Sequence, residues 1–125
     1  MAVTLQDNAR DAGVEAITDL CDSGTIEIKT AASTVAGTNE IAILTFGATA
    51  FGAASSGVVN ANAITDETNA NAGTASDATF FTSGSAAILQ CSVGTSGEDI
   101  NFSSVSFGAG DTISITSLSV TQPAS

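Results

Sequence analysis

The sequence predicts an all-β protein of one domain: a β-sandwich or jelly-roll-like barrel with one N-terminal α-helix. Three observations predict this fold. The apolar residues of 1–24 recur at three- and four-residue steps, whereas those of 25–125 alternate with polar residues. The alternating segments are short, and clusters of Gly, Ser, Asn and Asp separate them, as is typical of sandwiches and barrels. A length of 125 residues fits one domain, with a helical segment (1–24) before the β-structure (25–125).

The first segment has the pattern of an amphipathic helix. Its regularly spaced apolar residues are Leu5, Ala9, Ala12, Ala16, Ile17 and Leu20. Thr4 is the expected N-cap, Asp7 favours the helix start, and Gly24 is the expected stop. Because Gly13 costs about 1 kcal/mol relative to alanine, this helix needs support from other parts of the structure.

Four residues of this helix form a candidate partner-contact face: Leu5, Ala9, Ile17 and Leu20. An apolar helix face has to be covered by something. These side chains therefore either complete the subunit's own core or contact a neighbouring subunit.

Alternation with a period of two predicts the strands. The first six cover residues 25–29, 40–46, 59–63, 80–81, 89–93 and 100–107. In the last strand, Ile113 and Ile115 share one parity, whereas Leu118 and Val120 share the other. One extra residue at 116–117 would return both pairs to one buried face, so we predict a β-bulge there.

The predicted strands have little protection against pairing with other chains. Free-standing β-proteins commonly guard their edge strands with lysine, proline or inward-pointing charges. This chain has one lysine, Lys29, and one proline, Pro123, and the segments 40–46, 84–93 and 100–107 carry almost no charge. Either a closed barrel removes the edges, or neighbouring subunits cover them.

The charge balance excludes several kinds of partner. Thirteen acidic residues face only two basic ones, Arg10 and Lys29, which gives a formal net charge of -11. DNA and RNA phosphates need clusters of lysine and arginine, so we expect no direct nucleic-acid binding. An anionic membrane surface is disfavoured for the same reason, and we expect neither a secretion signal nor a membrane-spanning segment. A basic protein partner remains compatible with this charge.

The side chains that usually carry out catalysis are missing. The chain contains no histidine, tyrosine or tryptophan, so the commonest general base and nitrogen ligands for metals are absent. The neighbouring acids, such as Glu98 and Asp99, lie in predicted loops, where nothing indicates a pocket that would raise a carboxyl pKa. We therefore expect no enzyme and no catalytic, cofactor-binding or metal site.

Two weaker signals leave alternatives open. Cys21 and Cys91 form no metal-binding or redox motif, and they are either free and buried or joined in a disulfide. The long connection 66–77 contains oxygen ligands that could hold Ca²⁺, although their spacing differs from an EF-hand and favours an ordinary polar loop. Its oxygen-bearing residues are Asp66, Glu67, Asn69, Asn71 and Asp77.

Several segments resemble small virion-associated proteins of tailed phages and prophages. They are residues 51–65 (FGAASSGVVNANAIT), 93–102 (VGTSGEDINF) and 113–118 (ISITSL). The similarity covers roughly 25–124, with a helical N-terminus before it as in those proteins. The chain departs from the family pattern at 26–30 (IEIKT) and 80–82 (FFT), where members carry arginine and aromatic residues.

The resemblance implies a structural component of a phage particle, made in the cytoplasm of the bacterial host. We expect a decoration or cement subunit on the capsid exterior that binds the major capsid protein, copies of itself, or both, with a trimer as one arrangement. The alternative within this class is a tail tube or tip subunit, whose acidic lumen would repel DNA. A host-surface or glycan-binding module is the alternative from another class.

Overall fold

The computed structural model describes residues 3–124 and confirms a mostly β fold with one short helix. Helix α1 (Asp7–Thr18) runs into the 3-10 helix η1 (Asp19–Cys21). The strands are β1 (Thr25–Lys29), β2 (Glu40–Phe46), β3 (Val58–Asn60), β4 (Ile64–Thr65), β5 (Gly73–Thr74), β6 (Asp77–Phe81), β7 (Ala87–Gly94), β8 (Ile100–Asn101), β9 (Ser106–Phe107) and β10 (Ser119–Thr121). Within this part of the chain, no helix is long and apolar enough to cross a membrane.

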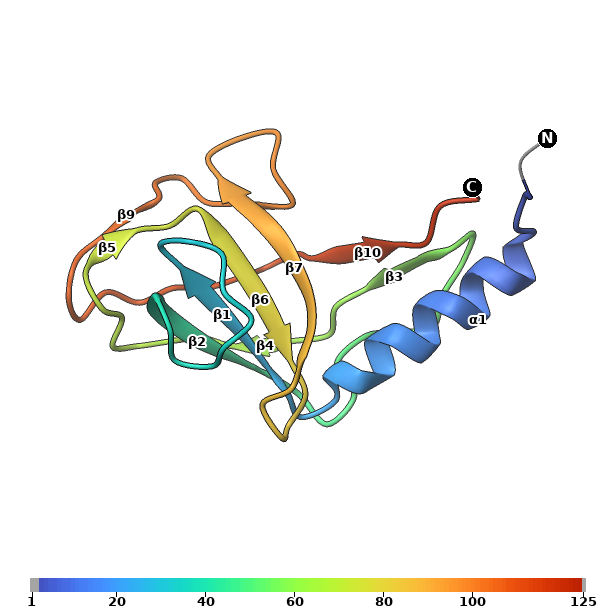
Figure 1. Cartoon of the computed structure of the whole chain (residues 1–125), viewed down its shortest axis with the longest axis horizontal. Coiled ribbons are helices and arrows are strands. Elements are labelled where there is room, and N and C mark those ends of the chain that lie inside the picture. The colour runs from blue at the N-terminus through green and yellow to red at the C-terminus, as the bar shows by residue number, and fades with distance from the viewer. Residues whose placement is uncertain (1–2, 125) are drawn as a thin grey trace.

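Six strands form one curled sheet in the order β4-β2-β1-β6-β7-β8 (Figure 1). All neighbouring strands in it are antiparallel except β7 and β8, which are parallel. Two short ladders, β3–β10 and β5–β9, lie outside this sheet. Helix α1 packs against β3 and β10, so the N-terminal segment and the end of the chain lie side by side (Figure 1).

Strand β1 lies between β2 and β6 and is buried on both faces. Ile26 and Ile28 point into the hydrophobic core, whereas Glu27 and Lys29 point to the opposite face, as the two-residue period of a strand requires. The C-terminal segment crosses the inner face of the sheet and contributes buried side chains to the same core: Ile113, Ile115 and Leu118. The curled sheet and this segment therefore enclose one core.

The outer face of β1 carries a buried ion pair. Lys29 Nζ lies 2.9 Å from Glu27 Oε1, and both side chains are almost inaccessible to solvent. Lys29 Nζ also donates hydrogen bonds to the carbonyls of Val35 (3.1 Å) and Thr38 (2.7 Å), and Glu27 Oε1 accepts one from Gly37 N–H (2.9 Å). The pair thus fastens the β1–β2 loop across the outer face of the sheet.

Helix α1 docks onto the rest of the molecule through polar side chains. The carboxylates of Asp11 and Glu15 accept hydrogen bonds from the backbone N–H groups of Gly57 (2.6 Å) and Ala54 (2.8 Å). Arg10 Nε donates to the backbone carbonyl that follows β10, at 2.9 Å. The buried residues of the helix are Val14 and Thr18, and neither belongs to the face that the sequence predicted to be apolar.

The predicted ends of the helix are wrong. Helix α1 begins at Asp7 with Gln6 as its N-cap, and no side chain caps it, so Thr4 does not have the expected role. The helical segment ends at Cys21, before Gly24. Gly24 serves a different purpose, because a Cβ atom there would collide with the backbone carbonyl oxygens of Phe81 and Cys21.

The predicted strands 25–29, 40–46, 80–81 and 89–93 are confirmed within β1, β2, β6 and β7, whereas the third and the sixth need correction. Of the predicted strand 59–63, only 59–60 belong to a strand, β3, which pairs with β10. Ala61 makes an isolated bridge with Phe51, and β4, which pairs with β2, begins only at Ile64. Likewise, β8 and β9 replace the predicted strand 100–107. The chain turns between them because Phe102 N–H bonds to Gly94 O, whereas Val105 O accepts from Ala75 N–H on another part of the molecule.

The change of parity in the last segment is confirmed, but the predicted bulge is not. Ile113, Ile115 and Leu118 are all buried, with Thr116 and Ser117 exposed between them. No ladder runs through 114–118, because the segment crosses the sheet and Ile113 makes only an isolated bridge. The two consecutive exposed residues, Thr116 and Ser117, therefore interrupt the alternation of buried and exposed side chains in an irregular extended segment, not in a paired strand.

In the 66–77 connection, the carboxylate of Glu67 is hydrogen-bonded to backbone N–H groups. Its carboxylate accepts hydrogen bonds from Ile43 N–H (3.3 Å) and Asn69 N–H (3.0 Å). Burial, and then the carboxylates of Glu27 and Glu67, raise the pKa of Glu40 nearby, although Lys29 opposes this shift. Among residues 3–124, no three acidic or cysteine side chains converge as metal ligands would.

Candidate interaction surfaces

The outward side of the N-terminal segment is an apolar surface, which we call the N-terminal apolar face. It consists of Val3, Leu5, Ala9, Ala12, Ala16, Ile17 and Leu20. Val3, Ile17 and Leu20 have exposed fractions of 83%, 38% and 55%, and in the described residues only Val35 is a comparably exposed large hydrophobic side chain. Leu5 is half-buried and the alanines are exposed. The predicted contact residues therefore do not complete the core of the chain itself.

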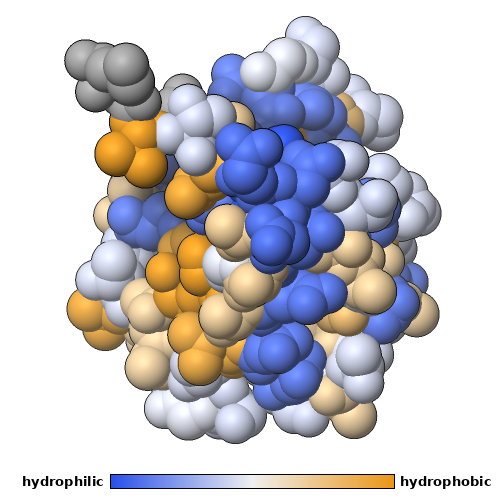
Figure 2. All heavy atoms as spheres, turned by 90° about the vertical axis from the view of Figure 1, so that its right-hand side faces the viewer, coloured by the Kyte–Doolittle hydropathy of each residue, from blue (hydrophilic) through white to orange (hydrophobic). Residues whose placement is uncertain are grey.

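This orientation follows from how α1 is held. Its charged side chains, Asp11 and Glu15, point toward the backbone near β3, and Arg10 points toward the end of β10. With a helical period of about 3.6 residues, the opposite side of the helix then carries uncharged residues alone. Figure 2 views the molecule from the right-hand side of Figure 1, and in this view hydrophobic surface gathers along one margin, next to a hydrophilic area. Exposed apolar surface of this kind marks interaction sites.

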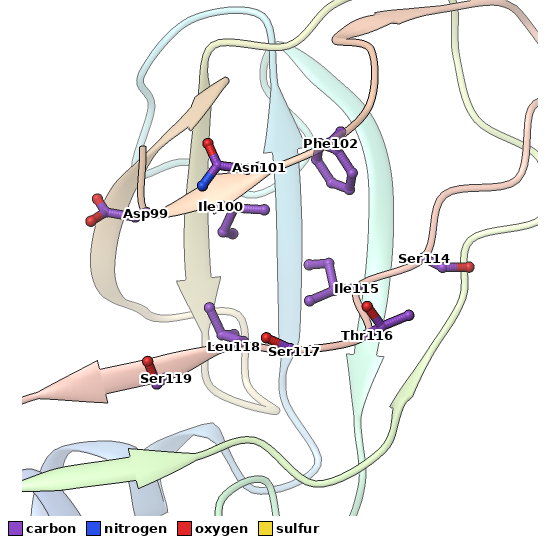
Figure 3. Close-up of a pocket in the computed structure, with 10 residues that line it drawn as sticks. All are labelled: Asp99, Ile100, Asn101, Phe102, Ser114, Ile115, Thr116, Ser117, Leu118 and Ser119. Atoms are coloured by element: carbon purple, nitrogen blue, oxygen red, sulfur yellow. The ribbon is translucent and has the colours of Figure 1, made fainter. Parts of the chain in front are cut away.

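A second candidate surface is a cleft between the β7–β8 side of the sheet and the C-terminal segment 114–121. It consists of two adjoining hollows of about 260 and 550 Å³, which share Asp99, Leu118 and Ser119. In the first hollow, the side chains of Ile100 and Ile115 point inward, and polar residues form the rim (Figure 3). The second hollow adjoins the solvent-exposed edge of β7 and the strand β10.

Apolar and acidic residues both line the larger hollow of the cleft. Phe80, Leu89 and Leu118 line the larger hollow, together with the exposed acids Glu98 and Asp99. Asp99 is held in place because its carboxylate accepts a hydrogen bond from the backbone N–H of Ser92, at 3.0 Å. The arrangement suits a ligand that offers apolar contacts and positive charge.

Both cysteines are free, so the disulfide alternative is wrong. Burial, and then the negative charge of Asp22, raises the pKa of the Cys21 thiol to about 11. Burial, followed by Asp99 and Asp77, raises the pKa of Cys91, which lines the cleft, to about 12. The thiols therefore stay protonated at neutral pH, and Asp99 and Asp77 add to the effect of burial at Cys91.

We expect both thiols to resist iodoacetamide at pH 8 in the native protein and to react readily in urea. At a pKa near 11, only about one thiol in a thousand is ionised at pH 8, and the thiolate is the reactive form. The measurement is mass spectrometry of alkylated protein, with Cys21→Ser and Cys91→Ser variants to assign each signal. Fast labelling of native Cys91 would contradict the result expected from burial.

The sequence prediction missed the cleft, although it contained a signal for it. In the sequence, segment 84–93 has the pattern of an unguarded strand, and Glu98 and Asp99 lie in a predicted loop. The structure brings these features together at one side of the sheet with residues 118–121, which are distant in sequence. Comparisons with known protein families, with curated proteins and with solved structures find no match.

Proposed function

We propose that the protein is a structural component of a tailed-phage virion: a decoration or cement subunit that stabilises the capsid exterior through protein–protein contacts. The observation that carries the proposal is the N-terminal apolar face, which a single subunit leaves in water. The proposed partners are the major capsid protein and copies of the chain itself, with a trimer as one arrangement. In this proposal the curled sheet and the short ladders form a β-sandwich or jelly-roll-like barrel.

Energetics and charge support a role in assembly. Full burial of an exposed isoleucine or leucine side chain contributes about 1.5–3 kcal/mol. Ile17 and Leu20 are 38% and 55% exposed, so each could contribute about half of this to an interface. Their neighbours Ala9, Ala12 and Ala16 are small, which allows a partner backbone to approach closely. The net charge of -11 would keep the free subunit soluble until it docks.

Two alternative functions are a tail tube or tip subunit and a host-surface or glycan-binding module, and the same experiments test them. A tail tube or tip subunit has the same need for intersubunit contacts, and its acidic charge would line a lumen that lets DNA pass. A host-surface or glycan-binding module would instead use the cleft as its ligand site. Cryo-electron microscopy of particles separates these candidates: density on the outer shell supports cement, and density confined to the tail overturns it. Binding on a glycan array would favour the third candidate.

The double variant Ile17→Ser/Leu20→Ser is expected to bind at least about tenfold more weakly to particles that lack the subunit, because central apolar anchors dominate interface energies. Both side chains are solvent-exposed in the subunit, so the fold should persist. The measurement is co-sedimentation of purified subunit with such particles. Val35→Ser is the matched control, since Val35 is 62% exposed in the β1–β2 loop. Equal binding by the double variant and this control would contradict the proposed role of the face.

A further inference from the structure

The edge of β7 offers unpaired backbone groups to the cleft. Val93 N–H bonds to Ser76 O, which lies on the β6 side of the strand. In an antiparallel ladder, alternate residues bond to the same neighbour, so Gln90 N–H and C=O point away from β6. On that side, β8 pairs only with Val93 and Gly94. On this side, no described strand pairs with residues 87–92. The carboxylate of Asp99 accepts a hydrogen bond from Ser92 N–H, whereas the backbone groups of Gln90 are left for a ligand.

Strand β10 presents a second open edge to the same cleft. Gln122 N–H bonds to Gly57 O, and Leu118 O accepts from Ala61 N–H, so the even-numbered residues of this segment face β3. By the same alternation, the backbone groups of Ser119 and Thr121 face away from β3. Ser119, Thr121 and Gln90 all line the larger hollow of the cleft.

The space between the two edges is suited to an extended peptide. The larger hollow has a volume of about 550 Å³, within the range of about 300–1,000 Å³ that is usual for ligand sites. Apolar side chains, including Leu89 and Val120, line it and could receive every second side chain of an inserted strand. Strand addition of this kind gains affinity from backbone hydrogen bonds and specificity from alternate side-chain pockets.

The charge of the cleft identifies the chemistry of its occupant. Glu98 and Asp99 line it, and the charges of Asp99 and Asp77 both act on Cys91 inside it. An inserted strand with lysine or arginine would complement this negative potential.

A second copy of this chain cannot supply such a strand. Lys29 is buried in its ion pair, and Arg10 lies in helix α1, where it pairs with Asp7. Since the chain has no other basic side chain, a basic extended segment has to come from a different protein.

We propose that the cleft between β7 and β10 binds an extended, basic segment of a partner protein by strand addition. The segment pairs with Gln90 on one side and with Ser119 and Thr121 on the other. It thereby joins the six-stranded sheet to the β3–β10 ladder. This inference does not depend on the virion proposal, because it concerns a different surface from the N-terminal apolar face.

The test uses an acetylated and amidated heptapeptide that alternates lysine and valine, with a matched peptide that carries glutamate in place of lysine. Isothermal titration calorimetry should show that the basic peptide binds at least about tenfold more tightly, with weaker binding at high salt. Hydrogen exchange followed by NMR should show that the peptide slows exchange of the Gln90, Ser119 and Thr121 amides at least about tenfold.

A pair of variants tests the role of the β7 edge. Gln90→Pro removes the outward N–H and should weaken binding of the basic peptide at least about tenfold, since proline is tolerated only at such an edge. Gln90→Ala keeps the N–H and should bind within about twofold of the native chain. If the proline variant does not fold, the exchange measurement on the native chain still decides the question.

Three outcomes would overturn the inference. The first is equal binding of the two peptides, or no binding of either. The second is binding that leaves exchange of the three amides unchanged. The third is a concentration-dependent dimer, detected by analytical ultracentrifugation without peptide, that protects these amides, because the occupant would then be a second copy.

Discussion

Replacing Lys29 by methionine is expected to lower the free energy of unfolding by about 3–5 kcal/mol, since removal of one partner leaves a buried charge uncompensated. Glu27 would lose its counter-ion at 2.9 Å. The carbonyls of Val35 and Thr38 would lose their donor, and the β1–β2 loop would be released from the sheet. Urea unfolding followed by circular dichroism measures the change.

Two controls separate the effect of the buried charge from that of the missing lysine. The double variant Glu27→Leu/Lys29→Met removes both charges and should recover most of the lost stability, as well-packed apolar pairs often replace buried ion pairs without loss. Arg10→Met removes the other basic residue, whose ion pair with Asp7 is largely exposed but whose Nε also donates to the carbonyl of Gln122, and it should cost about 1–3 kcal/mol, less than Lys29→Met. A loss below about 1 kcal/mol for Lys29→Met would show that the pair contributes little.

Gly24→Ala is expected to lower the free energy of unfolding by about 3 kcal/mol, the upper end of the usual cost of forcing an atom into packed space. The added Cβ would meet the carbonyl oxygens of Phe81 and Cys21, and both are backbone atoms that cannot rotate away. The connection from η1 into β1 would therefore have to move.

Gly84→Ala is the matched control for this substitution. Its added Cβ would have Thr82 Oγ1 as its nearest neighbour, at 3.8 Å, which is an ordinary contact. Thermal unfolding of both variants gives the comparison, and we expect the control to melt within about 2 °C of the native chain. Similar melting temperatures for the two variants would mean that the backbone at Gly24 can adjust.

The strands of the sheet centre were predictable because their pattern is local. The predicted segments 25–29 and 40–46 match the bounds of β1 and β2. The alternation in 25–29 did not reveal that Glu27 and Lys29 are buried. Their burial depends on the β1–β2 loop folding back over the sheet, which no periodicity within β1 reports.

The orientation of α1 was not predictable for a related reason. Hydrophobic periodicity identifies which face of a helix is apolar, but it does not say which face docks. Here the docking partners include backbone groups at Ala54 and Gly57, which precede β3 and are distant from the helix in sequence. The cleft likewise depends on the order of strands in the sheet, which places 87–92 at an edge.

The placement of the two basic residues also affects how long the protein would survive among digestive enzymes. Trypsin-like proteases cut after lysine or arginine and need several residues of accessible, extended chain around the cut. Lys29 is enclosed between the sheet and the β1–β2 loop. Arg10 lies within helix α1, and its Nε is hydrogen-bonded to the carbonyl that follows β10. Cleavage at either point therefore has to wait for local or global opening. The rate of this cleavage is limited by how rarely the chain opens, so the folded protein should resist trypsin-like proteases.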